Sequence, residues 1–233
     1  MTLGTVFVCT PMSAEPRLSS VLGSFVKALR LAAPDLEFHH VPIDHLPIDP
    51  STPRPRVAVP LSLTNHGDVA RAVANERLRD ADLLAAPALG PDWTLAEICV
   101  RRLVDSGAHQ SDTIVLGVVG SDDPAVIADY SRAAQLLSAV WGGPVHIGSV
   151  DGCDTHLGDA IDIARAYGKR VVVASYVLAA GETTESLRAS GADLVTAPII
   201  DSAAPDPRLI RLVLDRCRDA LRRGMPQNSQ VLL

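Results

Sequence analysis

Apolar residues along the chain gather in short runs that are separated by longer amphipathic segments. Most of these runs are continuously apolar and rich in Val, Ile and Leu, which is typical of strands buried on both faces in a parallel sheet. We therefore expect eight strands, at residues 5–9, 36–41, 56–63, 82–86, 113–119, 144–150, 170–178 and 193–197.

Helical periodicity fills most of the gaps between the predicted strands, most clearly over residues 16–33. A second helix begins near Thr94, which stands in the arrangement of a capping box with Glu97. A further helix follows Asp206, the expected N-cap ahead of Pro207. Strands that alternate with helices predict an α/β fold with right-handed crossovers.

Three short segments of the first half recur in the second half, in the same order and roughly 110 residues further along the chain. The pairs are residues 12–16 with 120–124, 56–68 with 170–182, and 81–87 with 192–198. One such match could arise by chance, but three matches in one order indicate a tandem duplication.

The repeat predicts two similar four-stranded parallel-sheet lobes, an N-terminal lobe over residues 1–108 and a C-terminal lobe over residues 109–233. The second lobe contains a helical segment at residues 155–168, whereas residues 45–55 of the first contain four prolines, which forbid a regular helix. Ligands of open α/β sheets bind beyond the carboxyl ends of the strands. We therefore expect the lobes to face a central cleft, lined by the loops after the first and third strand of each lobe.

The amino-acid composition argues against two kinds of binding partner. Aromatic residues make up 3% of the chain and the net charge is -6 with no dense basic patch, so we expect neither nucleic-acid nor membrane binding. The four cysteines form no Cys-x-x-Cys pair, which indicates reduced thiols in a cytoplasmic protein. No basic signal segment opens the chain, and no run reaches the roughly 18 apolar residues of a membrane span. Glycine-rich dinucleotide and Walker motifs are absent, so we expect no organic cofactor.

The paired turns that end in an acidic residue and a proline, the order of the elements and residues 171–199 carry a resemblance to a known family. The chain resembles the class II tetrapyrrole chelatases, and more narrowly the two-lobed sirohydrochlorin chelatases found in actinobacteria. This resemblance implies a protein that inserts a divalent metal ion, Co²⁺ or Fe²⁺, as a substrate into sirohydrochlorin during cobalamin or siroheme biosynthesis.

The resemblance breaks at the two histidines that hold the metal and accept the pyrrole protons in this family. The first of them belongs to a turn after the first strand, where this chain has Pro11. The second follows the third strand, where this chain has Asp68 at or near the matching position. Val119 and Glu182 stand at the equivalent places of the second lobe. Neither histidine is present, and a proline can neither coordinate a metal nor accept a proton.

His66, Asp68 and Glu182 are the candidates for the catalytic and metal-handling groups. An imidazole is a good ligand for cobalt and iron and a base near neutral pH, whereas a carboxylate is an oxygen ligand and a weaker base. The loops that carry the three residues belong to opposite lobes, so we expect them to face one another across the cleft. The alternative is that Asp68 and Glu182 only stabilise the N-termini of the helices that follow.

Ser13, Arg17, Gly120 and Ser121 are the candidates for substrate binding. The resemblance places Ser13, Gly120 and Ser121 along the cleft, where donors near helix N-termini favour the carboxylates of the ring. Arg17 could also reach a carboxylate. The alternatives are simple helix caps for the first group and an ordinary surface arginine for Arg17.

Two functions stay open from the sequence. The first is a chelatase with a rearranged site. The second is a catalytically degenerate relative that binds a tetrapyrrole or a metal, or that regulates a partner enzyme. A tetrapyrrole is the expected small-molecule partner in both cases, and a homodimer or an enzyme of the same pathway is the candidate protein partner.

Overall fold

The computed structural model describes residues 3–12, 16–152, 155–166, 170–201 and 205–224. Its strands are β1 (Gly4–Thr10), β2 (Leu36–Pro42), β3 (Arg56–Pro60), β4 (Leu83–Ala85), β5 (Thr113–Val118), β6 (Val145–Ser149), β7 (Val171–Ser175) and β8 (Leu194–Val195). Its helices are α1 (Pro16–Ala32), α2 (Asp68–Arg79), α3 (Trp93–Asp105), α4 (Pro124–Trp141), α5 (Leu157–Arg165), α6 (Glu182–Arg188) and α7 (Pro207–Gly224), with a 3-10 helix η1 (Ile43–His45). All eight predicted strands appear within these residues. No helix among them has the length and hydrophobicity needed to cross a membrane.

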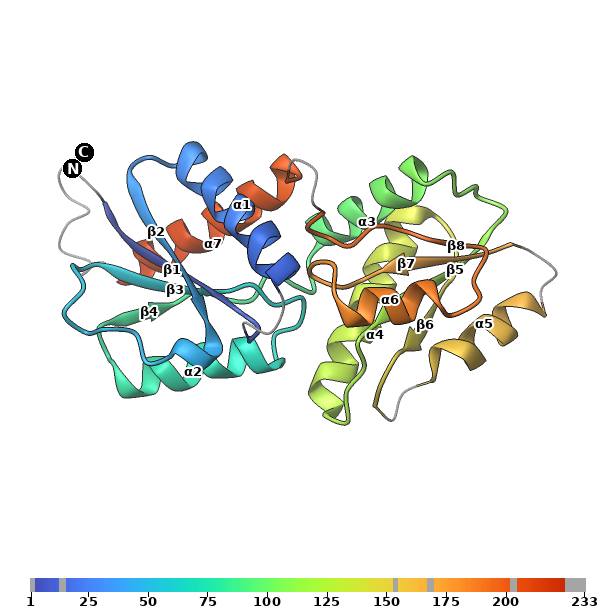
Figure 1. Ribbon diagram of the computed structural model, residues 1–233, viewed down its shortest axis with the longest axis horizontal. Helices are drawn as coiled ribbons and strands as arrows, with labels where there is room; N and C mark the ends of the chain where they lie inside the picture. The colour runs from blue at the N-terminus through green and yellow to red at the C-terminus, as the bar shows by residue number, and fades with distance from the viewer. Residues whose placement is uncertain (1–2, 13–15, 153–154, 167–169, 202–204, 225–233) are drawn as a thin grey trace.

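The strands form two parallel sheets with the same connectivity (Figure 1). The order is β2-β1-β3-β4 in the first sheet and β6-β5-β7-β8 in the second. The central strands β1, β3, β5 and β7 are buried along their whole length, as their continuous apolar runs predict. The predicted α/β fold of two four-stranded parallel-sheet lobes is therefore confirmed, and the shared strand order is what a tandem duplication would produce.

The two lobes differ between their second and third strands. In the second lobe α5 follows β6, whereas the first lobe has only η1 and an irregular segment before β3. This segment is the one that contains the four prolines. Ile48 from the segment is buried against Phe7 and Val73, so the irregular chain takes over part of the covering that a helix gives in the other lobe.

The last helix of each half packs on the sheet of the other half (Figure 1). α3 belongs to the first half of the chain and contacts α4 and β7, while α7 ends the second half and contacts β3, β4 and α1. One hydrophobic cluster therefore runs from Val8 in β1 through Leu95 in α3 to Leu116 in β5 and Val213 in α7. The division near residue 108 follows the sequence repeat and stays a prediction, but the packing crosses it in both directions.

Asp92 starts α3 and also ties it to the other exchanged helix. One oxygen of its carboxylate, Oδ1, accepts a hydrogen bond from the backbone nitrogen of Thr94 at 2.8 Å. The other oxygen, Oδ2, lies 2.9 Å from Nη2 of Arg216 in α7. The N-cap carboxylate of Asp92 thus links α3 and α7, the two helices that each pack on the sheet of the other half.

The structure confirms the predicted N-cap of α7 but not the predicted capping box of α3. The capping box was wrong, because Asp92 is the N-cap and Thr94 lies inside the helix. The Glu97 carboxylate instead accepts a hydrogen bond from the Trp93 indole at 3.0 Å. Asp206 is confirmed at the start of α7, where its Oδ1 accepts a hydrogen bond from the backbone nitrogen of Arg208 at 2.9 Å.

Arg56, the first residue of β3, is the largest fully buried side chain of the described residues. Its Nη2 lies 2.7 Å from Oδ2 of Asp80, which follows the last residue of α2. Its Nη1 donates a hydrogen bond to the carbonyl oxygen of Asp49 at 3.3 Å. A buried guanidinium must be paired. The ion pair therefore fixes the end of α2 to the start of β3, and the hydrogen bond to Asp49 fixes the irregular segment to the same residue.

The Arg56–Asp80 pair leads to a prediction about stability. Asp80→Asn should lower the free energy of unfolding by about 3 kcal/mol, because it leaves the Arg56 guanidinium buried without a charged partner. Urea unfolding followed by circular dichroism measures the change. The control is Asp82→Asn, which removes the exposed partner of Arg54 and should cost less than about 1 kcal/mol. Equal costs for the two variants would contradict the prediction.

Candidate functional site

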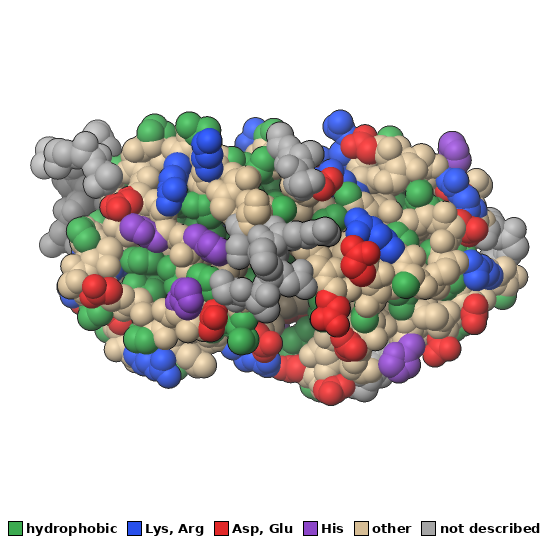
Figure 2. Space-filling model, viewed as in Figure 1, with side chains coloured by type: hydrophobic (Ala, Val, Ile, Leu, Met, Phe, Trp, Pro, Cys, Tyr) green, Lys and Arg blue, Asp and Glu red, His purple; other side chains and the backbone are tan. Residues whose placement is uncertain are grey.

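A cavity of about 570 Å³ lies between the lobes, beyond the carboxyl ends of β1, β3, β5 and β7. Its walls come from the loops after these strands and from the first turns of the helices that follow. On the face shown in Figure 2, acidic side chains gather beside the border between the lobes. The central cleft and the loops predicted to line it are therefore confirmed.

The walls of this interlobe cavity are mainly apolar. Leu61 and Leu63 come from the first lobe, and Val119, Tyr176 and Leu178 come from the second. Besides the hydroxyls of Tyr130 and Tyr176, the polar side chains among the lining residues are Ser62, Thr64, Asp68, Arg71, Ser121, Glu182 and Thr183. A cavity of this kind suits a ligand that has large apolar faces and polar groups at its edge.

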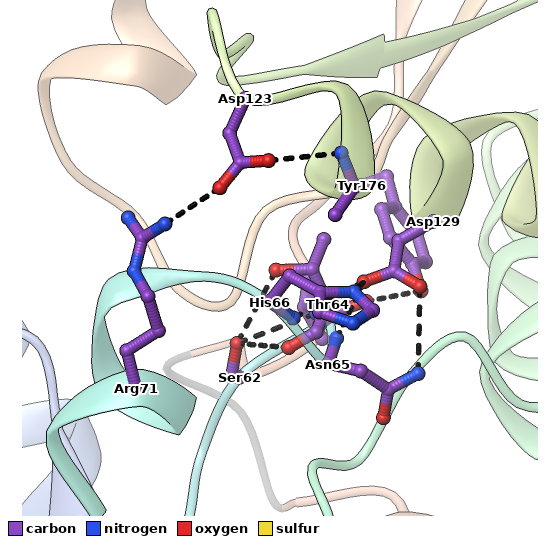
Figure 3. A network of polar contacts seen from close by, with 10 residues as sticks. Ser62, Thr64, Asn65, His66, Arg71, Asp123, Asp129 and Tyr176 are labelled. Atoms are coloured by element: carbon purple, nitrogen blue, oxygen red, sulfur yellow. Dashed lines mark hydrogen bonds and ion pairs between the residues drawn. The ribbon is translucent and has the colours of Figure 1, made fainter. Parts of the chain in front are cut away.

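Asp129, from α4 of the second lobe, holds the loop after β3 of the first lobe (Figure 3). Its Oδ2 accepts hydrogen bonds from the backbone nitrogens of Asn65 and His66, at 2.7 and 3.2 Å. The same oxygen lies 3.0 Å from Nδ1 of the His66 ring. Asp129 is buried, so a single desolvated carboxylate fixes the loop after β3 across the interface between the lobes. The same carboxylate also determines where the His66 ring lies.

Tyr176, directly after β7, makes a second polar contact between the lobes. Its hydroxyl donates a hydrogen bond to the carbonyl oxygen of Leu63 at 3.0 Å. Burial is the main cause that raises the pKa of Tyr176 well above its usual range. Gly90 packs against this contact, because a Cβ atom there would lie 2.5 Å from the Leu63 oxygen and 2.6 Å from the Tyr176 hydroxyl. A glycine is therefore required at this position for the lobes to meet.

Arg71, in α2, makes a third contact between the lobes at the wall of the cavity. Its Nη1 lies 2.6 Å from Oδ2 of Asp123 in the second lobe, and its Nη2 lies 2.7 Å from Oδ1 of Asp68 in its own helix. The hydrogen bond to Asp68 is the largest influence that raises the pKa of Arg71. The guanidinium is half exposed, in contrast to the buried groups of the other two contacts.

The structure brings two of the three predicted catalytic residues to the cavity. Asp68 lines it from the first lobe and Glu182 from the second, whereas His66 is not among its lining residues. The His66 ring is instead placed against Asp129. Within the described ranges no group of three or more His, Cys, Asp and Glu side chains could hold a metal ion. The three residues therefore do not face one another as expected, and their chemical roles stay predictions.

Asp68 and Glu182 are the first residues of α2 and α6 and are not the N-caps of these helices. The N-caps are Gly67 and Gly181, which offer no side-chain hydrogen bond. A carboxylate in the first turn of α2 is still favoured by the helix dipole. The alternative interpretation of Asp68 and Glu182 as helix-stabilising residues is thus compatible with their position at the cavity.

Two of the four predicted substrate-binding residues, Gly120 and Ser121, line the cavity. Gly120 has a φ of 101°, and a Cβ atom there would lie 1.6 Å from the carbonyl oxygen of Asp151, so this turn requires glycine. The Ser121 hydroxyl accepts a backbone hydrogen bond within the same turn. Ser13 lies outside the described residues. Arg17 lies in the first turn of α1, and its side chain is also outside what the structure describes.

Sequence reasoning missed the three side chains that join the lobes around the cavity. Asp129 has the pattern of an ordinary polar residue in an amphipathic helix, and Tyr176 stands within an apolar strand run. Neither residue carries a local signal of its contact in the other lobe. Arg71 does have one available signal, because it lies three residues after the candidate Asp68, where a helix places two side chains side by side.

The fold and the cavity define a class of protein, the two-lobed α/β proteins that can hold a ligand between two parallel sheets. Within this class the structure is similar to solved sirohydrochlorin chelatases. SirB from Bacillus subtilis with Fe³⁺ matches with a TM-score of 0.70 and 15% identity, over 96% of this chain and 97% of that chain. SirB from Bacillus subtilis subspecies spizizenii in complex with cobalt matches with a TM-score of 0.64 and 16% identity, over 98% of both chains.

A third solved structure, from Deinococcus radiodurans, is described as a multi-domain protein with structural similarity to chelatases. It matches with a TM-score of 0.61 and 14% identity, over 96% of this chain and 56% of that chain. No family model and no curated protein matches the sequence. The chain therefore has a sirohydrochlorin chelatase-like fold, and the resemblance found in the sequence is confirmed at the level of the fold.

Asp129 leads to a prediction about the loop after β3. Asp129→Ala should lower the free energy of unfolding by about 2 kcal/mol, because it leaves the backbone nitrogens of Asn65 and His66 without their acceptor. Urea unfolding measures the loss. The comparison variant is His66→Ala, which keeps both backbone hydrogen bonds and removes a half-exposed ring, so it should cost clearly less. A larger loss for His66→Ala would show that the ring carries the contact.

Tyr176 leads to a prediction about alkaline pH. The pKa of Tyr176 is raised in the folded protein, so the unfolded chain releases the phenolic proton first as the pH rises through about 10. The contribution of Tyr176 to stability is therefore complete below that pH and declines above it. Tyr176→Phe should cost about 1 kcal/mol near pH 7 and should lose less stability than the wild type between about pH 8 and pH 11.

Urea midpoints of the wild type and Tyr176→Phe across this range provide the measurement. Other buried groups that titrate in the alkaline range are present in both proteins, so the difference between the two curves isolates the tyrosine. Parallel curves would contradict the prediction.

Proposed function

We propose that the cavity between the lobes binds a tetrapyrrole of the sirohydrochlorin type, and that Asp68 and Glu182 bring Co²⁺ or Fe²⁺ to the ring. One observation carries this proposal: the interlobe cavity of a chelatase-like fold presents one carboxylate from each lobe. The solved relatives described as SirB with Fe³⁺ and SirB with cobalt support the choice of metals.

The size and walls of the cavity support a macrocyclic ligand. Its volume of about 570 Å³ falls within the range of pockets that bury small organic molecules. Leu63, Val119 and Leu178 offer apolar contact to the faces of a ring. Ser121 and Thr64 place polar groups in the cavity wall, which suits the carboxylates at the edge of such a ring. The proposed substrate class therefore follows from the combination of apolar walls and scattered polar groups.

The chemistry of metal insertion can be assigned to the two carboxylates. The reaction removes two pyrrole protons and exchanges the water around the metal ion for ring nitrogens. Carboxylate oxygens coordinate Co²⁺ and Fe²⁺, and they can accept protons from the ring. Glu182 is the freer of the two groups, because Asp68 is paired with Arg71. His66 is the less favoured candidate, since its ring is engaged with Asp129.

The side chains that line the cavity also favour a second function, which is binding without catalysis. No imidazole lines the cavity among the described residues, and Pro11 stands at the cavity wall where the family has a histidine. A protein with this wall could hold or deliver a tetrapyrrole, or regulate a partner chelatase, without accelerating metal insertion. Both functions begin with binding of the ring, so one assay separates them.

The assay combines purified protein with sirohydrochlorin and Co²⁺ or Fe²⁺ and follows the absorbance of the ring. We expect metal insertion faster than in the absence of protein. We also expect a loss of about tenfold or more in rate in both Asp68→Asn and Glu182→Gln, because each variant removes one of the two proposed metal ligands. The control is Glu185→Gln, which makes the same charge change on the exposed face of α6.

Each remaining outcome has a defined meaning. Binding of the ring without acceleration would reject the chelatase and leave the binding protein. An unchanged rate in His66→Ala would remove His66 from the mechanism. Absence of ring binding would reject both functions. A role in cobalamin or siroheme biosynthesis, a cytoplasmic location, and a homodimer or pathway-enzyme partner are further predictions that depend on a positive result.

A further inference from the structure

Arg71 is the one positively charged side chain among the described residues that line the interlobe cavity. The charged groups that share the wall with it are the carboxylates of Asp68 and Glu182. A carboxylate-rich ring would therefore meet negative charge at two points and a guanidinium at one. An arginine can bind a carboxylate through two parallel hydrogen bonds, which fixes the position of the ligand as well as its charge.

The guanidinium of Arg71 already contacts two carboxylates, each through one of its nitrogens. Nη1 contacts Asp123 across the border of the lobes (Figure 3). Nη2 contacts Asp68 one helical turn away. The side chain of Arg71 is half exposed and that of Asp68 is largely exposed. Ion pairs in such positions are weak, so a carboxylate of a bound ligand can compete for the guanidinium.

Asp123 has a second function that does not need Arg71. Its Oδ1 accepts a hydrogen bond from the backbone nitrogen of Ala125 at 2.9 Å and caps α4, while Oδ2 is the oxygen that contacts Arg71. The Asp123 side chain is one-third exposed. When Arg71 moves to another partner, Asp123 therefore keeps its cap and its access to water, and no buried charge is left unpaired.

We infer that the Arg71 guanidinium binds a carboxylate of the ring. This ligand carboxylate replaces the Asp123 carboxylate as the partner of Arg71 Nη1. The inference rests on the proposed binding of a tetrapyrrole in this cavity and identifies the residue that selects carboxylate-bearing rings. It also gives Asp123 a defined role as an internal competitor. Binding of the ring exchanges an ion pair between the lobes for one between the protein and its ligand.

The first test compares two water-soluble porphyrins of opposite charge. Uroporphyrin carries carboxylates around its rim, and a tetrapyridinium porphyrin carries cationic groups on a similar ring. Arg71→Gln should weaken uroporphyrin binding roughly tenfold, because it removes a charge-assisted contact, and should leave binding of the cationic porphyrin unchanged or tighter. Fluorescence titration of each ring measures both dissociation constants. Arg77→Gln is the control, since it removes the same charge from an exposed position on α2.

The second test uses the competitor and predicts a change of the opposite sign. Asp123→Asn keeps a good N-cap residue but removes the carboxylate from Nη1 of Arg71, while Nη2 stays paired with Asp68, so uroporphyrin should bind severalfold more tightly. Asp122→Asn is the control, because it removes the same charge from the neighbouring exposed position. If Arg71 served only to hold the lobes together, Arg71→Gln and Asp123→Asn would change the affinity in the same direction.

The outcomes separate this inference from the function on which it rests. Failure of the wild type to bind either porphyrin would reject ring binding itself. Binding of uroporphyrin that is equally strong in Arg71→Gln and wild type would reject Arg71 as the receptor and leave ring binding intact. An equal loss for the anionic and cationic rings would also reject the inference, because the effect would then be structural. Opposite shifts in Arg71→Gln and Asp123→Asn, each larger than in its control, would support it.

Discussion

A parallel sheet must be covered on both faces, and in this protein part of each covering layer comes from the other half of the chain. α3 belongs to the first half of the chain but packs against the second sheet, and α7 belongs to the second half but packs against the first sheet. The Asp92 carboxylate caps α3 and contacts Arg216 in α7, so the two crossings are tied together. This exchange sets the position of one sheet relative to the other, and with it the shape of the cavity between them.

The cavity lies where the exchanged packing leaves room, and three polar contacts complete its borders. Two of them, from Asp129 and Tyr176, are buried and act on the backbone of the loop after β3. The third, between Arg71 and Asp123, is exposed to solvent. Buried contacts of this kind resist competition from water, whereas the exposed one can be replaced at little cost. The same interface thus contains fixed parts that define the cavity and one exchangeable part that can respond to a ligand.

The sequence allowed the sheets to be predicted well because their signal is local. Short apolar runs, most of them continuous, indicated all the strands that the described residues form, and the repeat indicated two lobes and the loops between them. The site was predicted less well, because its side chains are oriented by residues far away in the chain. His66 has the chemistry of a metal ligand, but a carboxylate in the middle of α4 determines where its ring lies. The helix exchange was not predicted for the same reason, since an amphipathic face does not specify which sheet it covers.

The exchange of α3 and α7 also bears on how such a chain could have arisen. If the two halves descend from one shorter sequence, a half-length chain would have carried a last helix that its own sheet did not retain. Such an ancestor could bury the apolar face of that helix in a domain-swapped pair, with two identical chains exchanging helices. In a pair of identical chains both sides of the cleft must carry the same residues. Joining the two copies in one chain would have removed this constraint. Each side of the cleft could then change independently, as the different residues at Asp68 and Glu182 illustrate.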